Sequence, residues 1–85
     1  MKIVVTDRDI RLGVRRSTAA CPIARAVRRL TKDRSLRCGK DWIYGGSVHP
    51  VSIELPIKAR LFVRAFDDGK VVKPFSFSVR KLLRT

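Results

Sequence analysis

The sequence predicts a small α+β domain, and three features of the chain support this. Its 85 residues suffice for a single domain, residues 1–85, with a modest core. Apolar residues recur with helical spacing in two stretches, and they alternate with polar residues in two others. Glycine, proline or aspartate stands between most of these stretches, as turns and helix ends require.

The N-terminal half predicts one strand and one helix. Residues 2–6 are apolar and β-branched enough for a short strand, and residues 6–10 then form a turn or a single helical turn that ends by Gly13. A basic loop follows at residues 14–18. The helix is expected to begin at Cys21-Pro22, because proline at the first helical position has no N–H to leave unsatisfied. Its buried face would consist of Ile23, Ala26, Val27 and Leu30.

The C-terminal half predicts three strands and one helix. Residues 36–44 and 48–55 are expected to form two strands joined by a tight hairpin turn at Gly45-Gly46. Pro56 ends the second strand, and a helix follows that Asp67-Asp68-Gly69 closes, with Gly69 as its left-handed cap. The core face of this helix would be Ala59, Phe62, Val63 and Phe66. Residues 75–79 predict the last strand, and the basic tail 80–85 is expected to fray.

The predicted element order is strand, helix, strand, strand, helix, strand. This is the order of a ferredoxin-like split βαβ domain, with two helices on one face of a four-stranded sheet, although element order alone does not fix strand order. Trp42 and the four Phe are assigned to the core. The chain shows no apolar run of membrane-spanning length and no signal-peptide pattern, which predicts a cytoplasmic protein whose Cys21 and Cys38 remain thiols.

Positive charge is the main indication of function. The chain has 20 Lys and Arg against 7 Asp and Glu, and its formal net charge is +13. Within residues 1–40, twelve basic residues stand against three acidic ones. A large charge of one sign works against the compact state by self-repulsion, so we expect a partner that supplies negative charge. Nucleic acid or a nucleoprotein surface is the first candidate.

The first predicted helix carries this charge in a stripe opposite its apolar face. The stripe contains residues at i, i+3, i+4 and i+7, which are Arg25, Arg28, Arg29 and Lys32. A solvated face that stabilises the helix dipole is the alternative, but such a face usually mixes signs because like charges repel. Neighbouring segments would extend the surface with Arg15, Arg16, Arg34 and Arg37. Reversing Arg25, Arg28 and Arg29 to Glu is expected to leave the fold intact.

Other residues suggest weaker candidate sites. The strand aromatics Trp42, Tyr44, Phe75 and Phe77 could stack on bases, but such residues more often belong to the core. The chain contains no Asn and no Gln, which counts against reading of adenine and against a sequence-specific repressor.

Catalytic and metal sites are not predicted. Cys21 at a helix start favours a thiolate, but His49, the single histidine, is followed by Pro50 and is not an evident base. Cys21, Cys38 and His49 match no zinc spacing. The acidic pairs near residues 7–9 and 67–68 are explained as caps and turns. We therefore expect no enzyme, no cofactor and no metal.

Several landmarks together resemble a group of small proteins encoded by tailed phages and prophages. The N-terminal landmarks are Val5-Thr6-x-x-Asp9-Ile10-x-x-Gly13 and Cys21-Pro22-Ile23-Ala24-x-Ala26. The C-terminal ones are Leu55-Pro56, Phe62-Val63-x-x-Phe66-Asp67-x-Gly69 and Pro74-Phe75-x-Phe77. The resemblance implies a phage origin and a compact α+β fold, and it implies no catalytic residue. This chain is richer in Arg than the usual pattern of the group.

Two functions follow as hypotheses. The first is a non-enzymatic phage protein that acts on a host nucleoprotein machine, for example an anti-CRISPR-like inhibitor in counter-defence. The second is a free-standing nucleic-acid-binding accessory or regulatory protein that contacts phosphates without base specificity. A packaging component that neutralises DNA is a third reading. DNA, RNA and protein all stay open as partners, as does the oligomeric state.

Overall fold

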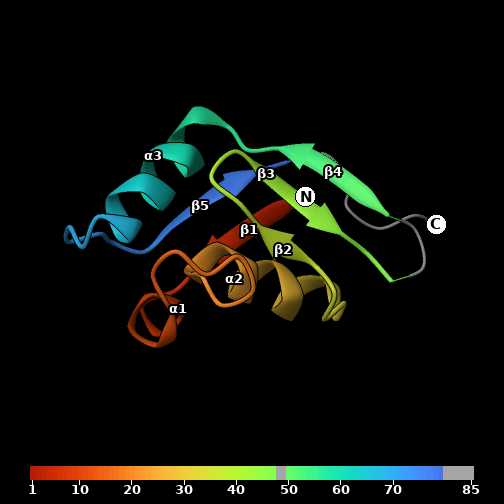
Figure 1. The fold of residues 1–85 in the computed structure, drawn as a ribbon, viewed down its shortest axis with the longest axis horizontal. Coiled ribbons are helices and arrows are strands. Elements are labelled where there is room, and N and C mark those ends of the chain that lie inside the picture. Colours follow the sequence, from red (N-terminus) through yellow and green to blue (C-terminus); the bar gives the residue numbers. More distant parts are fainter. Residues whose placement is uncertain (48–49, 80–85) are drawn as a thin grey trace.

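The computed structural model describes residues 1–47 and 50–79, which fold into two antiparallel sheets and three helices (Figure 1). The elements are, in chain order, β1 (Lys2–Val5), α1 (Asp7–Leu12), α2 (Pro22–Thr31), β2 (Arg37–Cys38), β3 (Trp42–Gly45), β4 (Val51–Glu54), α3 (Ile57–Asp67) and β5 (Phe75–Ser78). The predicted α+β class is confirmed. The predicted tail, residues 80–85, lies outside the described residues.

The prediction of a single four-stranded sheet is wrong. The described strands form a β1–β5 pair and a separate β2–β3–β4 meander. Residues 36–44 are not one strand, because the Gly39 N–H donates to the Trp42 carbonyl (2.8 Å) and closes a turn between β2 and β3. β2 therefore pairs with β3 rather than continuing into it, and β1 is left to pair with β5 alone.

The hairpin of β3 and β4 is confirmed, but its loop is longer than predicted. Gly45 is the last residue of β3 and pairs with Val51, so Gly45-Gly46 is not itself a two-residue turn. Gly45 has a φ of 109°, and a Cβ there would lie 2.5 Å from the carbonyl oxygen of Ser35. Glycine is thus required at this position by its backbone conformation and by the close approach of the segment before β2.

Both long helices begin and end where the sequence indicates. Cys21 is the N-cap of α2, and its Sγ accepts a hydrogen bond from the Ala24 N–H (3.3 Å). At the end of α3, the N–H groups of Gly69 and Lys70 donate to carbonyls of the last turn in a Schellman motif, as Gly69 predicts. Leu30 does not join the buried face of α2: it is 48% exposed, in the last turn before the left-handed Lys32.

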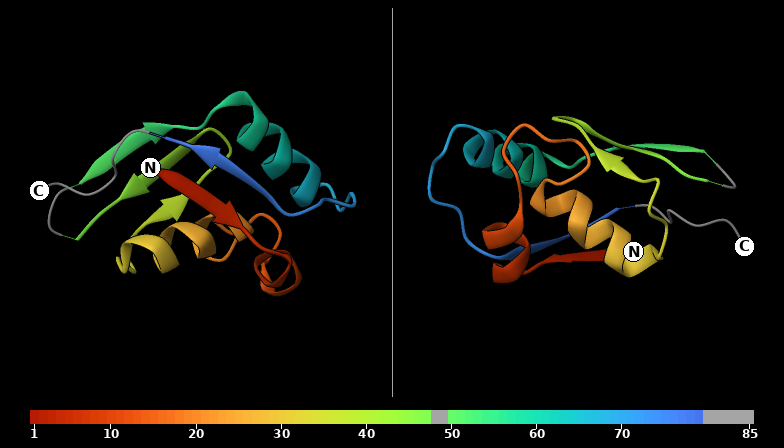
Figure 2. Two further views of the ribbon diagram at one scale, coloured as in Figure 1. Left: turned by 180° about the vertical axis from the view of Figure 1, so that it is seen from behind. Right: turned by 60° about the horizontal axis from the view of Figure 1, so that its bottom comes forward.

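The core lies between the two sheets and the helices that flank them. The β2–β3–β4 sheet lies in front of the β1–β5 pair in Figure 1, and the view from behind in Figure 2 reverses this order. α2 runs along one side and contacts β1 and β2. Fully buried side chains include Ile3 of β1, Ile23 of α2 and Ile43 of β3. The meander therefore has its inner face on the core and its outer face toward the viewer of Figure 1.

Candidate nucleic-acid interface

Four basic side chains line a hollow at the C-terminal end of α2. They are Arg28, Arg29, Lys32 and Arg34, and we call this site the basic hollow. Its volume is about 540 Å³, and its described lining includes no acidic residue. Arginine binds phosphate through a planar fork and lysine binds it as a point charge, so the lining suits an anion with several oxygens.

The loop after α2 is held in place by hydrogen bonds, and it carries Arg34 to the basic hollow. One oxygen of Asp33 accepts from the Ser35 N–H (3.0 Å) and hydroxyl (2.6 Å), and the other accepts from the Ser47 N–H (3.2 Å). The hydroxyl of Ser35 in turn accepts from the Gly46 N–H (3.1 Å). The hydrogen bonds from Ser35, followed by that from Ser47, lower the pKa of Asp33. In its ionised form, Asp33 thus holds the loop in place.

Arg29 binds an acidic residue of another helix, and the spacing of the basic residues on α2 did not indicate this contact. The carboxylate of Asp9, from α1, is fully buried and accepts two hydrogen bonds from the Arg29 guanidinium, at 2.6 and 2.9 Å. Arg29 also donates to the Val4 carbonyl (2.9 Å), and the Arg25 Nε lies 3.6 Å from Asp9. These contacts argue against the expectation that reversing Arg25, Arg28 and Arg29 leaves the fold intact, because a reversed Arg29 would face a buried carboxylate.

The charge of Asp9 is stabilised in spite of its burial. Burial by itself would raise the pKa of Asp9, but hydrogen bonds from Arg29 and Thr6 outweigh it, and the pKa lies below its ordinary value. The same contact raises the pKa of Arg29. Thr6 and Asp9 also form the capping box of α1, in which each side chain accepts from the backbone N–H of the other. Thr6-x-x-Asp9 was the sequence signal for this role.

The remaining predicted basic residues fall into two groups. Arg37 lies next to the basic hollow, since its guanidinium donates to the carbonyls of Arg34 (3.0 Å) and Leu36 (3.2 Å). Arg15 lies beside Gly69 after α3, and the Arg16 N–H donates to Asp67 (2.8 Å). These two flank the N-terminal end of α2, roughly 15 Å from the other end of this helix. They do not belong to the basic hollow.

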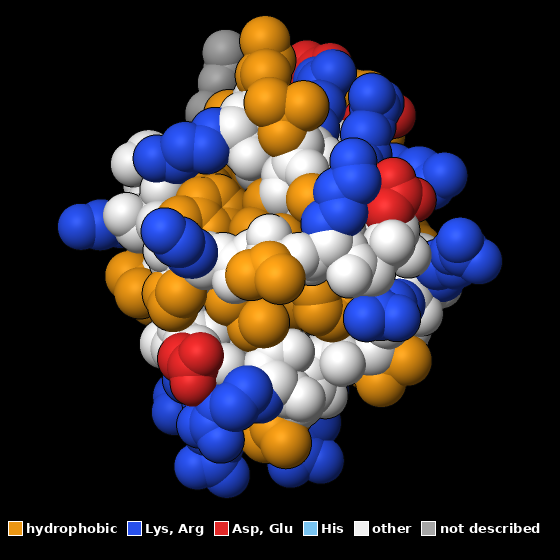
Figure 3. Space-filling view, turned by 90° about the vertical axis from the view of Figure 1, so that its left-hand side faces the viewer, with side chains coloured by type: hydrophobic (Ala, Val, Ile, Leu, Met, Phe, Trp, Pro, Cys, Tyr) orange, Lys and Arg blue, Asp and Glu red, His pale blue; other side chains and the backbone are white. Residues whose placement is uncertain are grey.

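Positive charge also extends beyond this site. Figure 3 shows the side of the molecule where α1 and the loop after α3 lie, with Lys and Arg side chains around a group of exposed hydrophobic ones. Acidic side chains are sparse on this face. Positive charge is therefore not confined to the basic hollow.

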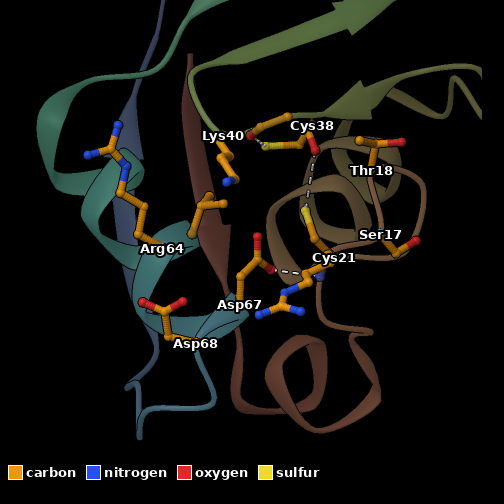
Figure 4. A pocket seen from close by; sticks show the side chains of 11 residues that line it. Ser17, Thr18, Cys21, Cys38, Lys40, Arg64, Asp67 and Asp68 are labelled. Atoms are coloured by element: carbon orange, nitrogen blue, oxygen red, sulfur yellow. Dashed lines mark hydrogen bonds between the residues drawn. The ribbon is translucent and has the colours of Figure 1, made fainter.

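A second hollow lies between the N-terminal end of α2 and α3 (Figure 4), and it contains both cysteines. Cys21 and Cys38 are buried free thiols, and the Cys21 Sγ lies 3.9 Å from the Cys38 carbonyl oxygen. Interaction with the Cys38 side chain lowers the pKa of Cys21 against the effect of burial, whereas interaction with Cys21 and burial both raise the pKa of Cys38. The described lining mixes both charge signs and includes no histidine.

The described part of the chain contains neither a metal-binding cluster nor a membrane-spanning helix. Among residues 1–47 and 50–79, no three His, Cys, Asp or Glu side chains are grouped so that they could hold a metal ion. His49, the third predicted ligand, lies outside the described residues. No helix of the described chain has the length and apolar character needed to cross a membrane.

The strand aromatics divide into two classes. Phe77 is buried, and Phe75 packs against Phe62 with ring centroids 4.6 Å apart, so the core assignment of these strand residues is confirmed. The same assignment is wrong for Trp42 and Tyr44, which are 46% and 39% exposed. Ile43 between them is fully buried, and a strand directs alternate side chains to opposite faces. This alternation was the signal that sequence reasoning missed.

Comparison of the chain with models of known protein families, with curated proteins and with solved structures gave no match. The resemblance to small phage proteins stays a prediction.

Proposed function

We propose that this chain is a non-enzymatic binding protein that holds the phosphate backbone of nucleic acid in the basic hollow. The observation that supports this most directly is the lining of four basic side chains with no acidic one among the described residues. Each phosphate bound there would release condensed counterions, which is the main source of affinity in sequence-independent binding.

Three of the four lining residues are available for a ligand. Arg29 is partly neutralised by Asp9, but Arg28, Lys32 and Arg34 form no ion pair among the described residues. Their charges repel one another across the hollow, and a bound anion relieves this repulsion. The site is thus better matched to an anionic ligand than to solvent alone.

The binding is expected to be independent of base sequence. Contacts to phosphate position a protein on nucleic acid but carry no sequence information. The residues that most often read adenine, Asn and Gln, are missing from the whole chain. The geometry therefore favours backbone recognition.

The same phosphates are present in free nucleic acid and in a host nucleoprotein machine in the cytoplasm. An anti-CRISPR-like inhibitor, the counter-defence role predicted from the sequence, would use the basic hollow to occupy or replace such a backbone. The hollow fits free nucleic acid and a nucleoprotein machine equally well, so the partner must be identified by experiment.

The test compares two triple variants that remove equal charge. The first variant replaces Arg28, Lys32 and Arg34 of the hollow by Gln. The control variant replaces Arg8, Lys70 and Lys73 by Gln, and these three residues are exposed and lie outside the hollow. Both variants lower the formal net charge from +13 to +10. Affinity for short DNA and RNA is measured by fluorescence anisotropy between 50 and 200 mM salt. The first variant should lose affinity, and its salt slope should fall by about 0.9 per lost phosphate contact on duplex DNA and by about 0.7 on a single strand.

Equal losses in both variants would contradict the proposal, because the binding would then depend on total charge. A purification from host lysate with and without nuclease then identifies the partner. A defined protein complex that survives nuclease, and that the Gln variant of the hollow no longer recovers, would indicate the inhibitor. Recovery of nucleic acid alone would indicate the free-standing binder.

A further inference from the structure

We propose that the outer face of the β2–β3–β4 sheet is a stacking platform for single-stranded nucleic acid. The platform consists of Trp42 and Tyr44 on β3, with Arg37 on β2 beside them. The inference rests on the proposed function, because it places the bases of the same strand whose phosphates the basic hollow would hold.

The two rings lie on one exposed face. Trp42 and Tyr44 are two residues apart on a strand, so both side chains point away from the core that receives Ile43. They are separated by roughly 7 Å along the strand, which gives each ring room for its own base. In Figure 1 no described element lies in front of this face. Large aromatic side chains exposed on a sheet have lost core burial, and base stacking offers a compensating contact.

The charges around the platform suit a polyanion. Arg37 is the cross-strand partner of Tyr44, so the two residues share a face. Its guanidinium also donates to the Arg34 carbonyl, so Arg37 lies beside the loop that carries Arg34 to the basic hollow. Glu54, the partner of Trp42 on β4, is ion-paired with Arg60 and is therefore partly neutralised.

A single strand fits this face better than a duplex. Bases in a duplex are stacked on their neighbours inside the helix, and their faces cannot reach a side chain. A single strand can direct its bases onto aromatic rings while a basic surface follows its phosphates, and stacking of this kind tolerates any sequence. The exposed aromatic face and the adjacent cationic hollow provide these two components.

The test uses the intrinsic fluorescence of Trp42, which is the single tryptophan of the chain. Oligo(dT) or oligo(U) is titrated into the wild-type protein, and a duplex of the same length is titrated in parallel. The single strands should quench Trp42 on binding, whereas the duplex should bind with little quenching. Anisotropy of a labelled strand then measures affinity for the variants Trp42→Leu and Tyr44→Ala.

Each of these variants should lose about five-fold or more in affinity for the single strand, and neither should lose affinity for the duplex. The matched control is Leu61→Ala, which removes an exposed apolar side chain from α3 and should leave both affinities unchanged. The platform is refuted if single strands bind without quenching Trp42 and the Trp42→Leu variant binds them normally. If the Gln variant of the hollow fails to bind in the same experiment, the proposed function stands. Equal quenching by duplex refutes the preference for single strands. Absence of binding to any nucleic acid at low salt refutes both.

Discussion

At the scale of single residues, the position of Asp9 separates basic side chains that hold the fold together from basic side chains without an acidic partner among the described residues. In the sequence, the four basic residues of the α2 stripe look equivalent. In the structure, an Asp9 carboxylate oxygen from α1 lies 2.6 Å from a guanidinium nitrogen of Arg29. Arg25 lies 3.6 Å from the same carboxylate, whereas Arg28 and Lys32 remain open to a ligand. One buried acid therefore distinguishes Arg25 and Arg29, which hold α1 against α2, from Arg28 and Lys32, which line the basic hollow without an acidic partner among the described residues.

The pH dependence of stability should reveal this acid. Because its pKa is lowered in the folded protein, Asp9 stabilises the fold fully above its ordinary value of 3.8, and this contribution is lost as the pH falls through the folded-state value. We expect Asp9→Asn to be less stable at pH 7 by roughly 1–3 kcal/mol and to lose less further stability by pH 3. Urea unfolding at the two pH values measures both. The control is Asp7→Asn, because Asp7 forms an exposed ion pair with Arg11, and its stability should depend on pH as that of the wild type does. If the stability of Asp9→Asn also depended on pH as in the wild type, Asp9 would not be the acid responsible.

At the scale of elements, local signals were sufficient for the helices but not for the sheets. Pro22 and Gly69 fix a helix start and a helix end within a few residues of themselves, so both could be read from the sequence. The pairing of Lys2 with Ser78 joins the two ends of the chain, and nothing near either residue specifies it. The basic residues were found because charge is visible in sequence. Asp9 was missed as their partner, because that contact crosses between helices.

The junction between the α2–β2 loop and β3 is the element on which the basic hollow depends. We expect Gly45→Ala to destabilise the protein by roughly 2 kcal/mol, because the residue needs a positive φ. The new Cβ would also press on the Ser35 carbonyl oxygen, 2.5 Å away, and displace the loop that carries Arg34. Gly39→Ala is the matched control, since its Cβ would meet no atom closer than 3.7 Å. Thermal unfolding and nucleic-acid affinity should both decline in the first variant alone; normal affinity in a folded Gly45→Ala protein would separate the loop from binding.

At the scale of the whole molecule, the net charge of +13 sets the balance between folding and binding. The molecule measures 37 × 21 × 18 Å, and the Debye length is about 30 Å at 0.01 M salt but about 10 Å at 0.1 M. At low salt its basic side chains therefore repel one another across almost the whole molecule, and at higher salt only neighbouring ones do. The exposed ion pairs that salt would weaken contribute little, so the loss of repulsion should dominate.

We therefore expect the melting temperature to rise between 0.01 and 0.1 M NaCl, while affinity for nucleic acid falls over the same range. Circular dichroism melts and anisotropy in matched buffers measure the two responses. Both triple Gln variants, at +10 instead of +13, should gain less stability from salt, because they have less repulsion to screen. Only the variant of the basic hollow should also show a weaker salt dependence of binding. A melting temperature that falls with salt would mean instead that attractive pairs such as Asp9 and Arg29 outweigh the repulsion among the basic side chains.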